Sequence, residues 1–347
     1  MNRHVRIWLA AALAVAAMLV AGNARALAYT HLIAFGDSLS DSGNNATALD
    51  AAFPPPGTAR TATPIVAPNF IPEFPYASDR YSNGPVWVEY LAAHLGLSAQ
   101  PSLLGGTNFA FGGARSGPFD PTFTAFPPSL STQVGAFLGV TGGVAPPSAL
   151  YVVQGGGNDA RDALVLLLGG GDPSALIDGY ATDMASIVED LQDAGARDIL
   201  LANVPNIGVT PAVRLLAEAL GLPLEALAAD LVMMMNSALE AELADLPGVP
   251  GVNIQLLNLF ELVNQVVANP ADFGFTDTTS SCAFLPACIA DPATTFFWDG
   301  IHPTTAAHAL LAQQALLVLL SEPGSLALIA IAILAGSGLR LRRRKTR

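Results

Sequence analysis

The sequence predicts an α/β fold in which a parallel sheet has helices on both faces. Four short apolar runs have the length of buried strands, and segments with helical spacing of apolar residues lie between and after them. The expected strands are residues 32–35, 149–154, 198–204 and 254–259, and the expected helices are 86–95, 178–194, 211–246, 260–268 and 304–320. The first two strands run into clusters of glycine and small polar residues. Such clusters are typical of the carboxyl edge, where open α/β sheets bind their ligands.

The first strand delivers a serine to that edge. Residues 32–35 form the apolar run, Gly36 ends it, and Ser38 lies in the polar turn cluster 37–45. Ser38 is therefore a candidate nucleophile, although Gly-Asp-Ser is also an ordinary turn sequence. A nucleophilic serine needs a base, an acid that orients the base, and donors for an oxyanion.

A candidate base and its acid precede the last expected helix. Asp299 comes three residues before His302, and Pro303 follows directly. On a tight turn this spacing can place the carboxylate on one imidazole nitrogen and leave the other nitrogen to face a nucleophile. The same two residues can instead cap the helix 304–320, for which Pro303 is a normal start.

Two further residues are candidate oxyanion donors. Asn158 follows the second strand behind three glycines, and an amide at such an edge can stabilise an oxyanion. Gly113 lies in the glycine-rich segment 105–117 and could present a main-chain N–H where no side chain would fit. Each residue also has an ordinary explanation as a turn or loop residue. Their order along the chain (Ser, Gly, Asn, Asp-x-x-His) makes the set more informative than its members.

The two ends of the chain differ from the middle in composition. Residues 1–28 combine basic residues, an apolar run and a small-residue cleavage site, which predicts a secretory signal peptide. Residues 321–347 contain an apolar stretch, 325–339, and an arginine-rich end. That stretch is shorter than the about 20 residues of a membrane span, and the basic end would stay cytoplasmic. The middle, residues 29–320, has the length of one large domain.

The domain 29–320 is strongly acidic. It contains six arginines and no lysine against 27 acidic residues, which gives a net charge near −21. A surface with this charge is poorly suited to bind nucleic acid or an anionic membrane.

Three segments are expected to be loops. The proline-rich segment 51–80 is expected to be an ordered surface loop or an access lid, and the segment 115–148 another loop. Their aromatic residues suit an apolar acyl pocket and equally suit a core. The segment 269–298 is expected to be a loop that holds the only two cysteines, Cys282 and Cys288. In an exported chain this pair predicts one disulfide over a small loop, and a metal site is disfavoured because no further cysteine completes a ligand set.

Five motifs together resemble the GDSL esterases and lipases of the SGNH hydrolase superfamily. They are FGDSLSDSGNN (35–45), RYSNG (80–84), GTNFAFGGA (106–114), GGGNDA (155–160) and FFWDGIHPTTAAH (296–308). The resemblance covers about residues 31–320 and implies a three-layer α/β/α sandwich with a flavodoxin-like parallel sheet. It implies that Ser38 is the nucleophile, that His302 is the base and that Asp299 orients it. It also implies that the oxyanion donors are the N–H groups of Ser38 and Gly113 and the side chain of Asn158.

Residues 321–347 resemble a second known element, the PEP-CTERM sorting signal. Ser-Glu-Pro at 321–323 stands where Pro-Glu-Pro is usual. The resemblance implies an exported protein of a Gram-negative-type bacterium, tethered transiently in the inner membrane. An exosortase would then cleave the tail, and the protein would reach the cell surface or the medium. A single-span tail anchor is the alternative, which the short apolar run disfavours.

The leading functional hypothesis is a secreted serine esterase or lipase that forms an acyl-enzyme on Ser38 and needs no metal or organic cofactor. A second hypothesis keeps the site and transfers the acyl group to a lipid, sterol or glycan hydroxyl. A third is a catalytically silent, matrix-associated protein with the same fold. The intact set of five candidate residues argues against the silent protein.

Overall fold

The computed structural model describes residues 29–52, 71–118 and 126–320 of the chain. The predicted signal peptide 1–28 and the predicted sorting tail 321–347 lie outside the described residues. Residues 29–316 form one compact unit. Among the described residues, none of the helices is long and apolar enough to span a membrane.

Four parallel strands form the central sheet in the spatial order β1-β2-β3-β4. They are β1 (Leu32–Gly36), β2 (Leu150–Gln154), β3 (Asp198–Ala202) and β4 (Asn253–Leu257). All four were predicted from their apolar runs, but β3 and β4 each end two residues early. β4 ends there because the next residue, Asn258, caps the following helix by accepting the Glu261 N–H.

The segment 107–111 extends this sheet along the free edge of β1. The Phe109 N–H donates to the Ala34 carbonyl at 2.7 Å, and the Phe111 N–H donates to the Gly36 carbonyl at 3.0 Å. Asn108 forms a parallel bridge with Ala34. The spatial order is then segment 107–111, β1, β2, β3, β4. Because the segment 107–111 follows β1 in the sequence and precedes β2, this is the flavodoxin-like order 2-1-3-4-5. The order reverses between β1 and β2, where open α/β sheets bind ligands.

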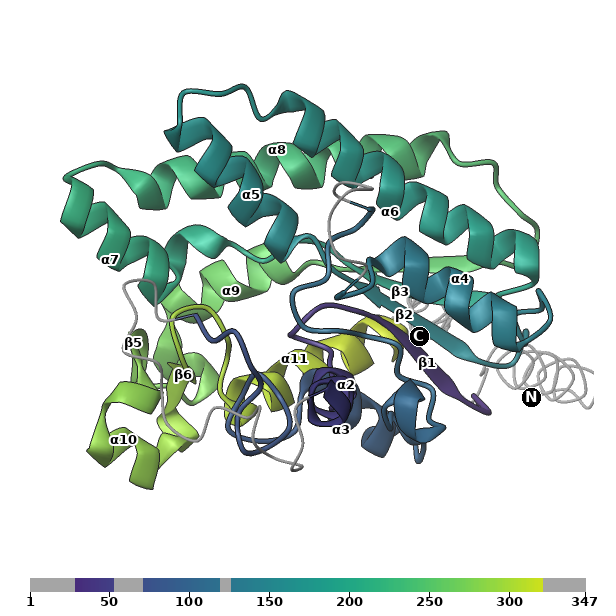
Figure 1. Ribbon diagram of the computed structural model, residues 1–347, viewed down its shortest axis with the longest axis horizontal. Helices are drawn as coiled ribbons and strands as arrows, with labels where there is room; N and C mark the ends of the chain where they lie inside the picture. Colours follow the sequence, from purple (N-terminus) through teal and green to yellow (C-terminus); the bar gives the residue numbers. More distant parts are fainter. Residues whose placement is uncertain (1–28, 53–70, 119–125, 321–347) are drawn as a thin grey trace, which may run out of the picture. The chain divides into compact units, whose positions relative to one another are not determined.

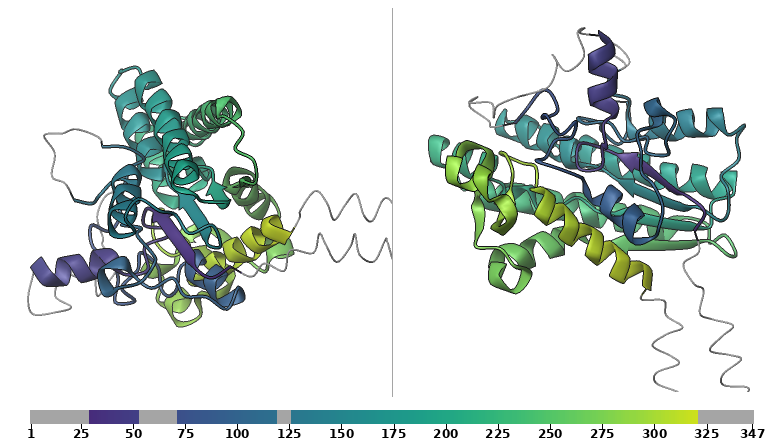
Figure 2. Two further views of the ribbon diagram at one scale, coloured as in Figure 1. Left: turned by 90° about the vertical axis from the view of Figure 1, so that its right-hand side faces the viewer. Right: turned by 90° about the horizontal axis from the view of Figure 1, so that it is seen from below.

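Helices cover both faces of the sheet, as Figures 1 and 2 show, so the fold is the expected three-layer α/β/α sandwich. Side chains alternate along each strand, and Phe35, Val153 and Leu201 share one core. That core includes residues of α4 (Leu130–Val140), α5 (Gly157–Leu168), α6 (Ser174–Ala194), α7 (Pro211–Leu220) and α8 (Leu224–Asp245). The opposite face carries α3 (Trp87–His94) and α11 (Thr305–Leu320), which are joined where the Trp87 N–H donates to His308 Nδ1 at 3.2 Å.

Several helices differ from the sequence prediction. α2 (Asn44–Ala52) begins inside the expected turn cluster 37–45, and α4 lies inside the expected loop 115–148. Neither helix start was predicted, because the residues around it are polar or proline-rich and resemble a turn. In α4 the Ser129 hydroxyl caps the first turn. The expected helix 211–246 is two helices, because Gly221 adopts φ 65° and ends α7. α9 (Leu259–Ala268) agrees with the prediction within one residue.

The segment 269–298 is not a plain loop, which corrects the sequence prediction. It contains two short parallel strands, β5 (Asp277–Ser281) and β6 (Thr295–Phe297), with α10 (Pro286–Ala290) between them. The strands were missed because Asp277–Ser281 has no apolar alternation. The expected disulfide between Cys282 and Cys288 is present, with an S–S distance of 2.03 Å.

Gly36 should be intolerant of any side chain. A Cβ atom at this position would lie 2.6 Å from the Gln154 carbonyl of the neighbouring strand. We expect Gly36→Ala to lower the free energy of unfolding by about 1–3 kcal/mol, as overpacking does. Guanidinium unfolding followed by circular dichroism measures this.

Gly135→Ala is the matched control, because a Cβ atom there meets nothing within 4 Å and the residue lies in the interior of α4. We expect it to raise the free energy of unfolding by about 0.5–1 kcal/mol. Equal effects of the two substitutions would show that the close approach at Gly36 is not a constraint.

Candidate active site

A continuous hydrogen-bond chain joins three of the predicted residues. His302 Nε2 lies 2.8 Å from Ser38 Oγ, and His302 Nδ1 lies 2.7 Å from Asp299 Oδ2. The exposed fractions are 8 % for Ser38, 3 % for His302 and 0 % for Asp299. These hydrogen bonds therefore lead from a buried carboxylate to a hydroxyl at the edge of the sheet. This is the geometry of a nucleophile, a base and an orienting acid.

The turn 299–303 has the local form that the spacing of its residues suggested. Asp299 Oδ1 accepts the N–H groups of Ile301 and His302, both at 2.8 Å, while Oδ2 remains for the imidazole. The alternative role of Asp299 as a helix cap is not observed. The Thr304 hydroxyl accepts the Ala307 N–H and caps α11 instead.

Sequence reasoning missed Tyr76, which donates its phenolic O–H to Asp299 Oδ2 at 3.0 Å. Burial and the neighbouring carboxylate raise the pKa of Tyr76, so the phenol remains a donor. Its ring packs edge-on against Trp298 at 5.8 Å. The only sequence signal for this role was weak, an aromatic residue in the proline-rich segment 51–80.

The motif RYSNG (80–84) anchors the turn that presents His302. The Ser82 hydroxyl donates to the Pro303 carbonyl at 2.8 Å, and Asn83 Oδ1 accepts the Thr305 N–H at 2.8 Å. The ring of Tyr81 lies 5.3 Å from the imidazole of His302.

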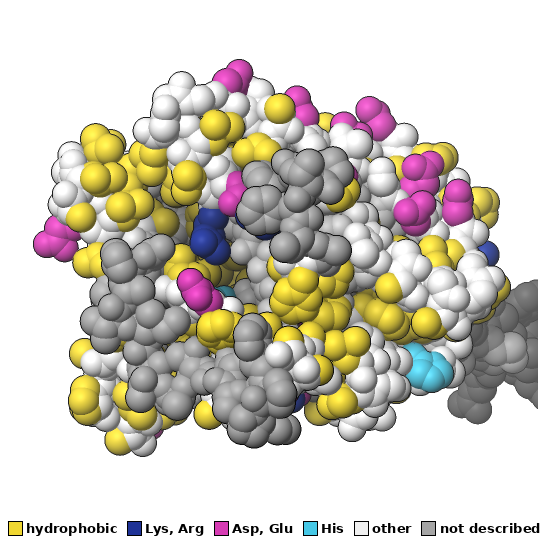
Figure 3. All heavy atoms as spheres, in the orientation of Figure 1, with side chains coloured by type: hydrophobic (Ala, Val, Ile, Leu, Met, Phe, Trp, Pro, Cys, Tyr) yellow, Lys and Arg dark blue, Asp and Glu magenta, His cyan; other side chains and the backbone are white. Residues whose placement is uncertain are grey.

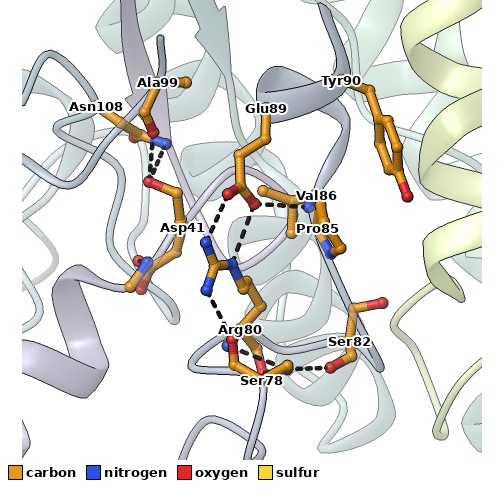
Figure 4. A network of polar contacts seen from close by, with 12 residues as sticks. Asp41, Ser78, Arg80, Ser82, Pro85, Val86, Glu89, Tyr90, Ala99 and Asn108 are labelled. Atoms are coloured by element: carbon orange, nitrogen blue, oxygen red, sulfur yellow. Dashed lines mark hydrogen bonds and ion pairs between the residues drawn. The ribbon is translucent and has the colours of Figure 1, made fainter. Parts of the chain in front are cut away.

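The same motif is tied to α3 through its arginine. Figure 4 shows Arg80 between Glu89 and Ser78, and its guanidinium donates to both oxygens of the Glu89 carboxylate and to the Ser78 carbonyl. This bidentate ion pair fixes the turn 80–84 relative to α3.

The polar residues after Ser38 hold the glycine-rich segment 105–117. Asp41, which is fully buried, accepts the N–H of Gly112 at 3.0 Å and those of residues 43–45 at the start of α2. Asn44 Nδ2 donates to the carbonyls of Asn108 and Ala110. These bonds explain why the motif 35–45 is polar far beyond its serine.

Of the two expected oxyanion donors besides Ser38, Asn158 lines the same pocket as Ser38 and Gly113 does not. Asn158, in the first turn of α5, lines the same pocket as Ser38 and His302, and its Nδ2 donates to the Ala114 carbonyl at 2.9 Å. Gly113, with φ 83°, is the residue before Ala114 but does not itself line the pocket. The Asn158–Ala114 bond therefore ties the glycine-rich segment to the start of α5.

A pocket of about 420 Å³ opens at these residues. Most of its wall is apolar, and its polar lining residues are Asp37, Ser38, Asn158, Arg161, Asn206, Thr210 and His302. The part formed by the bonded pairs Ser38–His302 and Asn158–Arg161 is called the polar corner below. The face shown in Figure 3 is hollowed near its middle, and hydrophobic side chains border the hollow. The apolar wall is formed mainly by Leu164, Val213, Leu216, Leu259, Val263, Phe296, Phe297, Ile301 and Leu311.

The other predicted features fall outside this pocket. The disulfide-bonded segment is attached near the site, because the Ala283 N–H donates to the Trp298 carbonyl at 2.8 Å, but neither cysteine lines the pocket. Ile71 is the one described residue of the segment 51–80 in the pocket wall. Within the described residues, no group of three or more His, Cys, Asp or Glu side chains is arranged to hold a metal ion.

Comparison with known proteins gives a consistent result. The family model described as GDSL-like Lipase/Acylhydrolase matches residues 32–315. The chain is 29% identical over 357 residues to Esterase EstA of Pseudomonas aeruginosa, an alignment that covers 92% of this chain and 51% of that protein. The chain thus spans about half the length of the Pseudomonas esterases that it matches.

Two other relatives align over most of the domain. The chain is 28% identical to a GDSL esterase/lipase of Arabidopsis thaliana, with 82% of this chain and 90% of the relative covered. It is 26% identical to the thermolabile hemolysin of Vibrio parahaemolyticus, with 82% of this chain and 62% of that protein covered.

Asp37, beside the candidate nucleophile, should make stability depend on pH. Its carboxylate is buried and accepts the Leu39 N–H at 2.9 Å, and burial raises its pKa from 3.8 to about 6. Between pH 4 and 6 the folded protein therefore binds more protons at this site than the unfolded chain. The contribution of Asp37 to the free energy of unfolding is thus greatest below pH 4 and falls as pH rises to 6.

Asp37→Asn removes this titration. We expect the difference in free energy of unfolding, variant minus wild type, to rise by up to about 3 kcal/mol between pH 4 and pH 7. Urea unfolding of both proteins across this range measures it. A difference that stays constant with pH would contradict the burial effect.

Proposed function

The chain belongs to the GDSL-like lipase/acylhydrolase family, and on that premise we propose that it hydrolyses carboxylic esters through an acyl-enzyme on Ser38. The observation that supports this most strongly is the buried hydrogen-bond chain from Asp299 through His302 to Ser38, which ends at a largely apolar pocket. An apolar pocket beside a nucleophile suits the acyl chain of an ester.

Acylation begins when Ser38 Oγ attacks the ester carbonyl carbon and His302 Nε2 takes the hydroxyl proton. The 2.8 Å contact between these atoms needs no rearrangement. Asp299 stabilises the imidazolium and holds Nδ1 protonated, so that Nε2 is the basic nitrogen. The Tyr76 hydroxyl, bonded to the same carboxylate oxygen, keeps that oxygen in place.

The tetrahedral intermediate carries a negative oxygen that requires donors. The amide of Asn158 has two N–H groups, and one of them is committed to the Ala114 carbonyl. The second N–H is assigned to the oxyanion, together with the main-chain N–H of Ser38. The N–H of Gly113 is the third donor that the family resemblance implies, although Gly113 does not line the pocket.

Breakdown of the intermediate releases the alcohol, which takes its proton from His302. Water then attacks the acyl-enzyme while His302 again accepts a proton. The acid leaves, and Ser38 regains its hydroxyl hydrogen. Each step uses only residues of this chain and water.

We also propose that the protein is exported. The support is in the sequence alone: the signal-peptide pattern of residues 1–28 and the tail 321–347, with its short apolar stretch and basic end. In this proposal an exosortase-type enzyme removes the tail after a transient stay in the inner membrane. Mass determination of the mature protein tests it, and intact residues at both ends would refute it.

Ser38→Ala should abolish ester hydrolysis. We expect the wild type to cleave p-nitrophenyl esters of graded chain length and to react with a fluorophosphonate probe, because its serine is activated. The variant should do neither while keeping the wild-type circular dichroism spectrum. A folded wild type that neither labels nor turns over any ester would favour a silent site.

Asn158→Ala should reduce kcat by a factor on the order of 10²–10³, the usual cost of one oxyanion donor. Asn253→Ala is the matched control, since Asn253 lies at the start of β4, at the opposite, amino-terminal edge of the sheet, and does not line the pocket. We expect the control to keep kcat within a few-fold of wild type. Similar losses in both variants would remove Asn158 from the proposed oxyanion site.

A further inference from the structure

We infer that the pocket selects esters whose alcohol part carries a phosphate or carboxylate group, and that Arg161 binds this anion. The inference rests on the proposed ester hydrolysis and names its substrate class.

Arg161 lies in the polar corner of the pocket. It is on α5, three residues after Asn158, so the two side chains share one face of the helix. Both line the pocket with Ser38 and His302, and Arg161 Nη1 lies 3.3 Å from Asn158 Oδ1. The guanidinium is therefore next to the place where the ester carbonyl would bind.

Among the described residues, this arginine lacks a carboxylate partner at ion-pair distance. Arg80 is paired with Glu89, and Arg115 takes up Asp162, the residue beside Arg161. Arg197 and Arg214 also form no ion pair among the described residues, and what distinguishes Arg161 is its place in the pocket wall. Burial lowers the pKa of Arg161, which reflects a partly desolvated cation. A guanidinium stays charged in proteins, so a bound anion would relieve this cost.

The geometry of the donors also favours an anion. A guanidinium has five N–H donors in a fixed planar fork that matches carboxylate and phosphate oxygens. The one hydrogen bond described for Arg161, to Asn158, uses a single donor and an uncharged acceptor. The remaining donors can form a bidentate contact with a substrate group.

The apolar wall decides which part of the ester carries the anion. Residues such as Leu216, Val263 and Leu311 line the rest of the pocket and would penalise a charge. The acyl chain fits this wall. The alcohol part of the ester then lies at the polar corner, and the anion that Arg161 binds belongs to this part.

The net charge of the domain does not oppose this contact. Exposed charges are screened beyond about 8 Å at physiological ionic strength, whereas Arg161 would meet the anion directly in a partly desolvated corner. Asp37 also lines the pocket, but burial raises its pKa to about 6, so its negative charge is reduced in mildly acidic solution.

A purely positioning role for Arg161 makes a different prediction. If its only task were to orient the Asn158 amide, removing it would slow the hydrolysis of every ester by the same factor. An anion-binding role changes the ratio between anionic and neutral substrates. The ratio is therefore the informative measurement.

The experiment compares three esters with the same hexanoyl chain on the full-length protein. The alcohols are glycerol (neutral), glycerate (carboxylate) and glycerol phosphate (phosphate). We expect the wild type to have a higher kcat/KM for at least one anionic ester than for the neutral one, and the two anionic arms show which group is preferred. Arg161→Gln should lower the anionic-to-neutral ratio at least tenfold, mainly through KM. Arg161→Lys should retain part of the ratio.

Arg197→Gln is the matched control, because it removes the same charge at the opposite, amino-terminal edge of the sheet, just before β3. It should leave the ratio unchanged. Equal losses on all three esters in Arg161→Gln, or a wild type without preference for either anionic ester, would overturn the inference and leave the esterase proposal intact. If no ester is cleaved in a Ser38-dependent way, the proposed function fails, and the inference fails with it.

Discussion

The buried carboxylate of Asp299 is the constraint on which the site depends. A charged group without exposure must have its lone pairs satisfied, or it would cost several kcal/mol. Here two main-chain N–H groups, the imidazole of His302 and the phenol of Tyr76 surround it. Satisfying the carboxylate sets the form of the turn 299–303. It also draws the end of the proline-rich segment against that turn and fixes the imidazole toward Ser38.

The length of the polar motif 35–45 is explained by the contacts that its residues make. Only Ser38 faces the imidazole, whereas Asp41 and Asn44 bond to the glycine-rich segment 105–117. Gly112 must be a glycine because a Cβ atom there would lie 2.1 Å from the ring of Tyr81, which itself lies against His302. The nucleophile, the glycine-rich segment and the base are thus positioned by one set of contacts.

Charge is distributed unevenly between the surface and the site. The domain is acidic overall, yet the pocket has an apolar wall and one arginine in its polar corner. The acidic side chains at the site are buried and bonded to main-chain N–H groups, as for Asp41 and Asp299. The pocket therefore offers a local preference for an anionic group that net charge by itself would not suggest.

The sequence by itself determined the four strands, most of the helices, and the candidates Ser38, Asn158 and His302, because these signals are local. Apolar runs identify buried strands, and a three-residue spacing allows Asp299 to reach the imidazole of His302 on a tight turn. Only the tertiary structure decided the partners of Tyr76 and Arg161. Tyr76 meets a carboxylate 223 residues further along the chain, and Arg161 lines the same pocket as Ser38 and His302 while Asp162 beside it pairs with Arg115. Contacts of that kind arise when distant segments pack together, and no local pattern records them.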